Sequence, residues 1–224
     1  MMEKKGSAIN MTSPAHDTKA RVMASAAKLF AQNGYAATST KDICDDAKVN
    51  IAAIHYHYKS KENLYRHIIT HFATQGFDRV SQILRPPKTM EEFRVRLEMF
   101  LESGTETMIE HPAVTQIILR DVAIMNRLCR DIFMSTFGRI DSEVVSFLKA
   151  AKKKGVLRHD MDPFMAAQFL TNQLTSQNHY AREIRKLFRS GDLSDPVYRR
   201  KWVRETVSLF LIGVMDRHQE PNSQ

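Results

Sequence analysis

Residues 33–64 decide the fold of this chain, and they read NGYAATSTKDICDDAKVNIAAIHYHYKSKENL. Gly34 is typical of a helix C-terminus, while Asn50 and Ser60 are suited to capping the helices that follow them. The stretch predicts a short helix over residues 41–47, a tight turn, and a further helix from Asn50 to about residue 57. A helix presented in this way can lie in a groove of DNA.

The rest of the chain also favours helices. Only 8 Gly and 7 Pro occur in 224 residues, and no clear alternating strand run or Asn-Gly hairpin signal stands out. Apolar residues recur at helical spacing, with capping signals such as Thr89 followed by Glu92. We therefore expect an all-α protein. The expected helices cover residues 17–33, 41–47, 50–57, 60–84, 89–110, 113–125, 127–153, 162–188 and 197–216.

The expected organisation is a flexible arm at residues 1–15, a helix-turn-helix domain at 16–66 and a helical domain at 67–224. The formal net charge is +8. Residues 17–66 hold eight Lys or Arg against five Asp or Glu, a denser positive charge than in the remainder. Such a concentration suits a phosphate-binding head, although ordinary solubilising charge would look the same.

Cysteine usage and hydropathy point to the cytoplasm. Cys44 and Cys129 lie in different segments and form no disulfide framework, which fits a reducing compartment. No apolar run approaches the ~18–20 residues that span a bilayer, and the N-terminus lacks a signal-peptide core. We expect a cytoplasmic protein with no membrane partner.

The predicted groove-reading helix has two faces. Val49, Ile54 and Tyr58 form the inward, apolar face. The outward set is Ile51, Ala52, Ala53, His55, Tyr56 and His57. His55 and His57 are two residues apart and do not share a helix face, so metal binding by this pair is not expected. Ordinary surface histidines would give the same pattern.

This segment resembles the DNA-binding head of the tetracycline-repressor (TetR) family of bacterial regulators. The resemblance covers about 50 residues. It is carried by Ala26–Phe30, Gly34–Tyr35, Thr38–Thr40, Ile43, Val49–Asn50, Ile54, Tyr56–Tyr58 and Ser60–Leu64. The resemblance implies phosphate contacts by Thr40 and Lys41 at the start of the second helix, and by Lys61 at the start of the fourth. Lys59 lies at the junction with the fourth helix, and from that position it can also reach phosphate. It also implies that the outward set faces the groove.

The chain departs from the family pattern at four of these positions. Ala52 and Ala53 stand where the family often has Gly and then Ser or Thr, His55 where it often has Tyr, and Tyr58 where Phe is usual. Ile51 and the two alanines offer methyl groups rather than hydrogen-bond donors. Because methyl groups suit the thymine methyls of the major groove, we expect an A·T-containing half-site.

In this family the second domain forms a dimer and binds a small molecule. The expected last helix is apolar around much of its circumference, which predicts burial against several neighbours. We expect a homodimer through the last two helices, 162–188 and 197–216, with a monomeric core as the alternative. Large apolar candidates for an effector pocket, with one polar partner, are Phe100, Met125, Phe133, Phe137, Met165, Phe169 and Gln173. Any of them could instead be plain core.

Signs of metal or catalytic chemistry are weak. His67 and His71 are spaced to share a metal, but no third ligand is apparent nearby in sequence, and a surface pair is the simpler interpretation. Cys129 lies beside two arginines and could sense oxidants or be an inert thiol. No phosphate loop or nucleophile motif is present.

We therefore expect no cofactor, no metal and no enzymatic activity. The predicted function is a ligand-responsive repressor that binds palindromic operator DNA as a homodimer and is released by an apolar or aromatic effector. The alternatives are a DNA-binding interaction factor without a small effector, and a helical enzyme with a cluster of titratable groups in a cavity.

Overall fold

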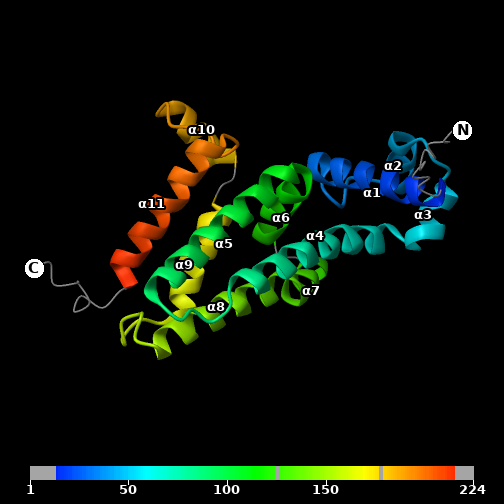
Figure 1. Cartoon of the computed structure of the whole chain (residues 1–224). Coiled ribbons are helices and arrows are strands. Elements are labelled where there is room, and N and C mark those ends of the chain that lie inside the picture. Colours follow the sequence, from blue (N-terminus) through cyan, green and yellow to red (C-terminus); the bar gives the residue numbers. More distant parts are fainter. Residues whose placement is uncertain (1–13, 125–126, 177–178, 215–224) are drawn as a thin grey trace, which may run out of the picture. The chain divides into compact units, whose positions relative to one another are not determined.

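The computed structural model describes residues 14–124, 127–176 and 179–214. These residues form helices and no β-sheet, as the sequence predicts (Figure 1). Most of the expected arm at residues 1–15 lies outside them. The helices are α1 Pro14–Asn33, α2 Thr40–Ala47, α3 Ile51–Tyr58, α4 Lys61–Ile83, α5 Met90–Glu110, α6 Pro112–Ile124, α7 Arg127–Ser135, α8 Phe137–Lys153, α9 Pro163–Thr175, α10 His179–Leu187 and α11 Pro196–Val214. None of these helices has the length and apolarity needed to cross a membrane.

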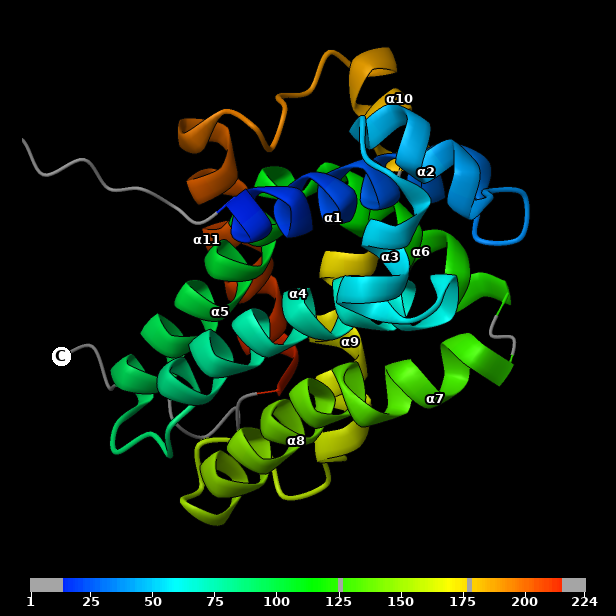
Figure 2. The same cartoon turned by 90° about the vertical axis from the view of Figure 1, so that its right-hand side faces the viewer.

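The chain divides into two compact units, residues 1–68 and 69–224. The first unit holds α1, α2, α3 and the start of α4, and α1 to α3 are grouped together in Figure 2. Its core is made by Val22 and Phe30 of α1, Ile43 of α2, Ile54 of α3 and Leu64 of α4, all of them buried. Each helix contributes residues from one face only, so the amphipathic spacing in the sequence is what brings the four segments together.

The second unit is built around α5, α8, α9 and α11, in which α5 packs on α11 and α8 on α9. The rings of Phe93 and Phe147 stack with their centroids 5.2 Å apart at the centre of this core. Gly104 of α5 lies so close to Leu174 of α9 that an added Cβ would come within 2.7 Å of the Leu174 side chain. A larger residue at position 104 would therefore force the Leu174 side chain to move.

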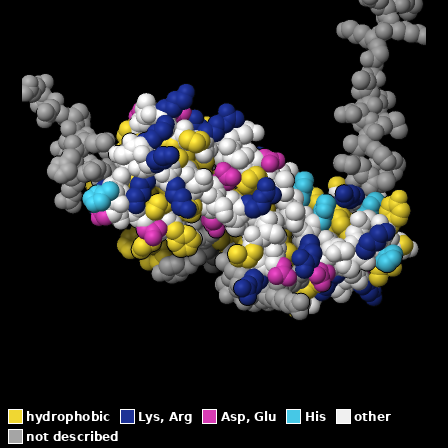
Figure 3. All heavy atoms as spheres, turned by 90° about the horizontal axis from the view of Figure 1, so that it is seen from below, with side chains coloured by type: hydrophobic (Ala, Val, Ile, Leu, Met, Phe, Trp, Pro, Cys, Tyr) yellow, Lys and Arg dark blue, Asp and Glu magenta, His cyan; other side chains and the backbone are white. Residues whose placement is uncertain are grey.

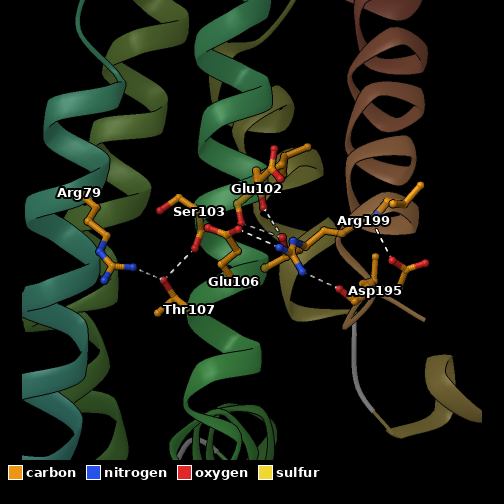
Figure 4. A network of polar contacts seen from close by, with 11 residues as sticks. Arg79, Glu102, Ser103, Glu106, Thr107, Asp195 and Arg199 are labelled. Carbon is orange, nitrogen blue, oxygen red and sulfur yellow. Dashed lines mark hydrogen bonds and ion pairs between the residues drawn. The ribbon is translucent and has the colours of Figure 1, made fainter. Parts of the chain in front are cut away.

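A polar network also joins helices of the second unit (Figure 4). Arg199 of α11 donates to a carboxylate oxygen of Glu106 on α5 at 2.8 Å and to the carbonyl of Leu193 at 3.0 Å. Arg79 of α4 donates to the hydroxyl of Thr107 on α5 at 3.2 Å. Arg199 is only 7% exposed, so its charge depends on these partners.

The predicted helix over residues 127–153 is wrong, because the chain breaks at Thr136 into α7 and α8. The Thr136 hydroxyl donates to the carbonyl of Ile132 at 2.6 Å, and the Ser135 hydroxyl donates to that of Asp131 at 2.8 Å. Hydroxyls that bond to the preceding turn compete with the helical backbone. The apolar period continues through the break, so periodicity could not reveal it.

Two helices, α9 and α10, lie within the predicted helix over residues 162–188. Ser176 ends α9, α10 begins at His179, and residues 177–178 lie outside the described part of the chain. The hydroxyls of Thr171 and Ser176 again donate to carbonyls of their own helix, those of Ala167 and Gln173. The start of α9 is as expected from the sequence, because the Asp162 carboxylate accepts the amides of Phe164 and Met165.

Candidate nucleic-acid interface

The recognition-helix candidate, α3, is held at both ends and along one face. Asn50 caps its N-terminus by accepting the Ala52 amide at 2.9 Å. Ile54 and Tyr58 are only 3% and 5% exposed, as the inward face predicts. The Tyr58 hydroxyl donates to the carbonyl of Lys19 in α1 at 3.0 Å, and burial raises the pKa of Tyr58 to about 12. The helix is thus fixed against α1 while its other face stays open.

The open face of α3 carries most of the residues that the sequence predicts for DNA reading. Ile51 is 57% exposed and Tyr56 72%, and Ala52 and His55 are also exposed. Ala53 and His57 are half-buried, and the His57 ring lies 4.8 Å from that of Tyr56 in an edge contact. Figure 3 shows basic, histidine and apolar side chains interspersed over one face of the molecule. Apolar and imidazole groups suit base edges, whereas lysines suit phosphates.

The start of α2 is closed by a capping box between Ser39 and Asp42. The Ser39 hydroxyl accepts the Asp42 amide at 3.1 Å, and the Asp42 carboxylate accepts both the hydroxyl and the amide of Ser39. These bonds lower the pKa of Asp42. Beside the cap, Thr40 is half-buried and Lys41 is exposed, which leaves the lysine accessible to a phosphate.

One acidic side chain near the turn is neutralised. The Lys28 ammonium lies 2.6 Å from Asp46, and the Ser25 hydroxyl donates to the same carboxylate at 2.8 Å. Both partners lower the pKa of Asp46, the lysine by more. Their pairing connects α1 to the end of α2 and reduces the negative charge next to the turn before α3.

Lys61 occupies a place that the sequence did not predict. Its ammonium donates to the carbonyls of Tyr35 and Thr38 at 2.9 and 2.8 Å, and lies 4.4 Å from the centroid of the Tyr35 ring. The same ring belongs to an aromatic cluster with Phe30 and Tyr65. Two of the three ammonium donors are therefore used inside the unit, which favours a positioning role over the expected phosphate contact. Lys59 is exposed and bonds only weakly, to the carbonyl of Tyr56 at 3.5 Å.

The predicted effector residues that the structure describes differ in their exposure. Met165 is 69% exposed, and Phe169 is also exposed, with its ring stacked on that of Phe210. Their place in an effector pocket stays a prediction. Phe100 is buried in the main core of the second unit, and Gln173 is half-buried on α9. Met125 lies outside the described residues.

Two of the predicted effector residues do come together. The rings of Phe133 and Phe137 stack at 5.0 Å. Phe72 joins them, with its centroid 6.5 Å from that of Phe137, and its edge contact with His111 adds a polar group. Phe72 and His111 were not predicted. Phe72 lies on α4 and His111 caps the end of α5, and the spacing within one helix carries no signal for contacts with other elements.

The histidines and cysteines have the following surroundings. His67 makes an edge contact with the Tyr58 ring at 5.4 Å, and His71 lies 3.2 Å from the Gln75 amide. Within residues 14–124, 127–176 and 179–214, no group of three His, Cys, Asp or Glu side chains could hold a metal. Cys44 is buried, which raises the pKa of its thiol, and Asp45 adds to the effect. The Cys129 side chain lies outside what the structure describes.

A capped helix fixed on a three-helix core, with its outer face open and lysines beside it, defines the chain as a helix-turn-helix DNA-binding protein. Residues 22–68 match the family model described as "Bacterial regulatory proteins, tetR family". The first unit therefore carries a DNA-binding domain of the TetR family, and the match supports a TetR-family transcriptional regulator.

Relatives and solved structures agree with this family. A Bacillus subtilis protein named "Probable HTH-type transcriptional regulator YttP" is 25% identical over 79% of this chain and 97% of its own length. The HTH-type transcriptional repressor KstR2 of Mycolicibacterium smegmatis is 28% identical over 65% of this chain and 70% of its own. The structure of the ketosteroid transcriptional regulator KstR2 of Mycobacterium tuberculosis has a TM-score of 0.65 and 19% identity, covering 89% of this chain and 95% of that one.

Proposed function

We propose that the protein is a repressor that binds palindromic operator DNA as a homodimer and is released by a small apolar or aromatic effector. The observation that carries DNA reading is the division of α3 into a buried face, with Ile54 and Tyr58, and an open face, with Ile51 and Tyr56. The word repressor in the names of the KstR2 relatives supports repression. A regulator of this kind acts on the chromosome, so we also propose a cytoplasmic location and no catalytic role.

Operator binding is tested by selecting random duplexes with the full chain. Because Ile51, Ala52 and Ala53 present methyl groups, the selected half-sites should contain thymine opposite this end of α3. Two half-sites should recur one helical turn apart, about 34–36 Å, or a multiple of it. Selected sites without two-fold symmetry would contradict binding as a homodimer. Selected sites without thymine would contradict the proposed contacts of Ile51, Ala52 and Ala53.

Exposed apolar residues on α9 and α11 support the dimer. Phe169 of α9 stacks on Phe210 of α11, so the two helices are neighbours. Together they leave large apolar side chains open, namely Phe164, Met165, Phe169, Val197, Leu209 and Ile212. An apolar face of this kind is typical of an obligate interface.

Sedimentation of a Leu209→Glu, Ile212→Glu double variant tests this interface. We expect a monomer where the unaltered chain gives a dimer, since two carboxylates per subunit would be buried without partners. Met134→Glu is the matched control, because Met134 is equally exposed but lies on α7. A double variant that stays dimeric would place the interface elsewhere.

The aromatic group of Phe72, Phe133 and Phe137 supports an apolar or aromatic effector, because such rings bind flat apolar ligands well. The test is release of the selected operator by a panel of hydrophobic compounds, followed by native mass spectrometry of the protein with each active compound. We expect a Phe137→Ala variant to keep operator affinity and lose release. No release by any compound would favour the interaction factor without a small effector.

A further inference from the structure

Two lysines on either side of α3 have positive φ angles. Lys48, which ends α2, has φ 54° and ψ 50°, and Lys59, which ends α3, has φ 70°. Glycine adopts positive φ without a steric penalty, whereas a residue with a Cβ does so at a cost. The backbone conformation at such a position therefore favours glycine over lysine.

The left-handed conformation at Lys48 is needed for the turn itself. The Lys48 amide donates to the carbonyl of Asp45 at 3.3 Å, and the Val49 amide donates to that of Cys44 at 3.0 Å. These bonds end α2 and direct the chain into Asn50, which caps α3. Glycine is the usual residue where a helix ends in this way.

The Lys48 side chain makes no compensating contact within its unit. It is exposed, and in the described part of the chain its ammonium has neither a hydrogen bond nor an ion pair. The nearby Asp46 is already paired with Lys28. What the lysine adds, compared with glycine, is one unpaired positive charge next to the start of α3.

That end of α3 is the part that enters a groove in this motif, and Ile51 and Ala52 are both exposed there. The major groove is about 12 Å wide, so phosphates lie on both sides of a helix placed in it. A long, unpaired cation on the turn before the helix is well placed to reach one of them.

We propose that Lys48 is a phosphate-binding residue of the DNA interface, and that its positive charge is the reason for a lysine at a position where glycine would fold better. This inference rests on the proposed operator binding. It adds to that proposal a residue outside the predicted contact set.

The decisive variant is Lys48→Gly, because stability and affinity should change in opposite directions. We expect a higher midpoint of thermal unfolding, since the left-handed strain is removed. We also expect weaker operator binding, and a plot of log K against log salt that is shallower by about 0.9 for each subunit bound. Lys48→Arg should keep the salt slope of the unaltered chain. Lys48→Gln should have the same shallower slope as Lys48→Gly, but without any gain in stability.

Arg189→Gly is the matched control. Arg189 is also an exposed cation at positive φ, 52°, but it lies in the second unit. Its replacement should raise stability and leave operator affinity and salt slope unchanged.

The outcomes separate this inference from the proposed function. If the unaltered chain binds no duplex, operator binding fails and the role of Lys48 fails with it. If the unaltered chain binds and both Lys48→Gly and Lys48→Gln keep its slope, only the role of Lys48 is overturned.

Discussion

The Lys61 ammonium lies 2.8 Å from the carbonyl oxygen of Thr38, and it binds the carbonyl of Tyr35 at the same time. One side chain at the start of α4 thereby holds the turn between α1 and α2. Thr38 also donates its hydroxyl to the carbonyl of Gly34 at 2.8 Å. The turn that leads into α2 is therefore fixed by polar bonds from both sides.

Lys61→Met should destabilise the first unit by about 1–3 kcal/mol, because methionine keeps the stem but leaves two partly buried carbonyls without a charged donor. Urea unfolding measures this change. Operator affinity should fall, while the salt slope should change by clearly less than the ~0.9 per subunit of a lost phosphate contact. Lys59→Met is the control. It should leave the stability unchanged and make the salt slope shallower by the full ~0.9 per subunit. A full loss of slope in Lys61→Met would restore the phosphate role expected from the family resemblance.

Substitutions of the two isoleucines of α3 should have different effects, one on stability and the other on base preference. Ile54→Ala should cost about 2–5 kcal/mol, because it opens a cavity among fully buried neighbours. Ile51→Ala should change stability by less than about 0.5 kcal/mol, because the side chain is exposed. Ile51→Ala should instead alter the bases preferred in a binding selection. An unaltered preference would remove Ile51 from the reading face.

The pairing of Lys28 with Asp46 should make the stability of the first unit depend on acidity. The pKa of Asp46 is lowered in the folded state, chiefly by Lys28 and then by Ser25. A lowered pKa stabilises the fold above the unfolded value, near 4, and this contribution is lost as the pH falls through the folded pKa. Lys28→Met should therefore be less stable than the unaltered chain at pH 7, and the difference should shrink towards about pH 2. Urea midpoints at the two pH values give the answer, and a difference independent of pH would contradict it.

The contact between Arg199 and Glu106 predicts an asymmetry between its two partners. Glu106→Met leaves a buried guanidinium whose one remaining acceptor among the described residues is the neutral Leu193 carbonyl. Arg199→Met instead leaves a carboxylate that is 44% exposed to water. Removing the carboxylate should therefore cost more, by about 1 kcal/mol or more, than removing the arginine. Thermal unfolding of both variants tests the order. Equal costs would show that solvent reaches Arg199.

The sequence predicted the first unit better than the second for a physical reason. Helix caps such as Asn50 and the alternation of Ile54 and Tyr58 with exposed neighbours are local signals, and they were read correctly. The bonds of Lys61 reach carbonyls 23 and 26 residues away, and no periodic pattern encodes them. Met165 and Phe169 show the same limit, since apolar spacing on a helix is identical for an interior and for an exposed interface.

The hydroxyl of Tyr58 bonds to a carbonyl 39 residues earlier in the chain. A helix of eight residues is too short to persist alone in water, so α3 owes its shape to α1 and α2. Excising α3 as a peptide, or grafting it onto another scaffold, would therefore abolish base discrimination even with every groove-facing side chain retained. The smallest part of this chain that could be moved to another protein with its DNA-reading helix intact is therefore the whole first unit.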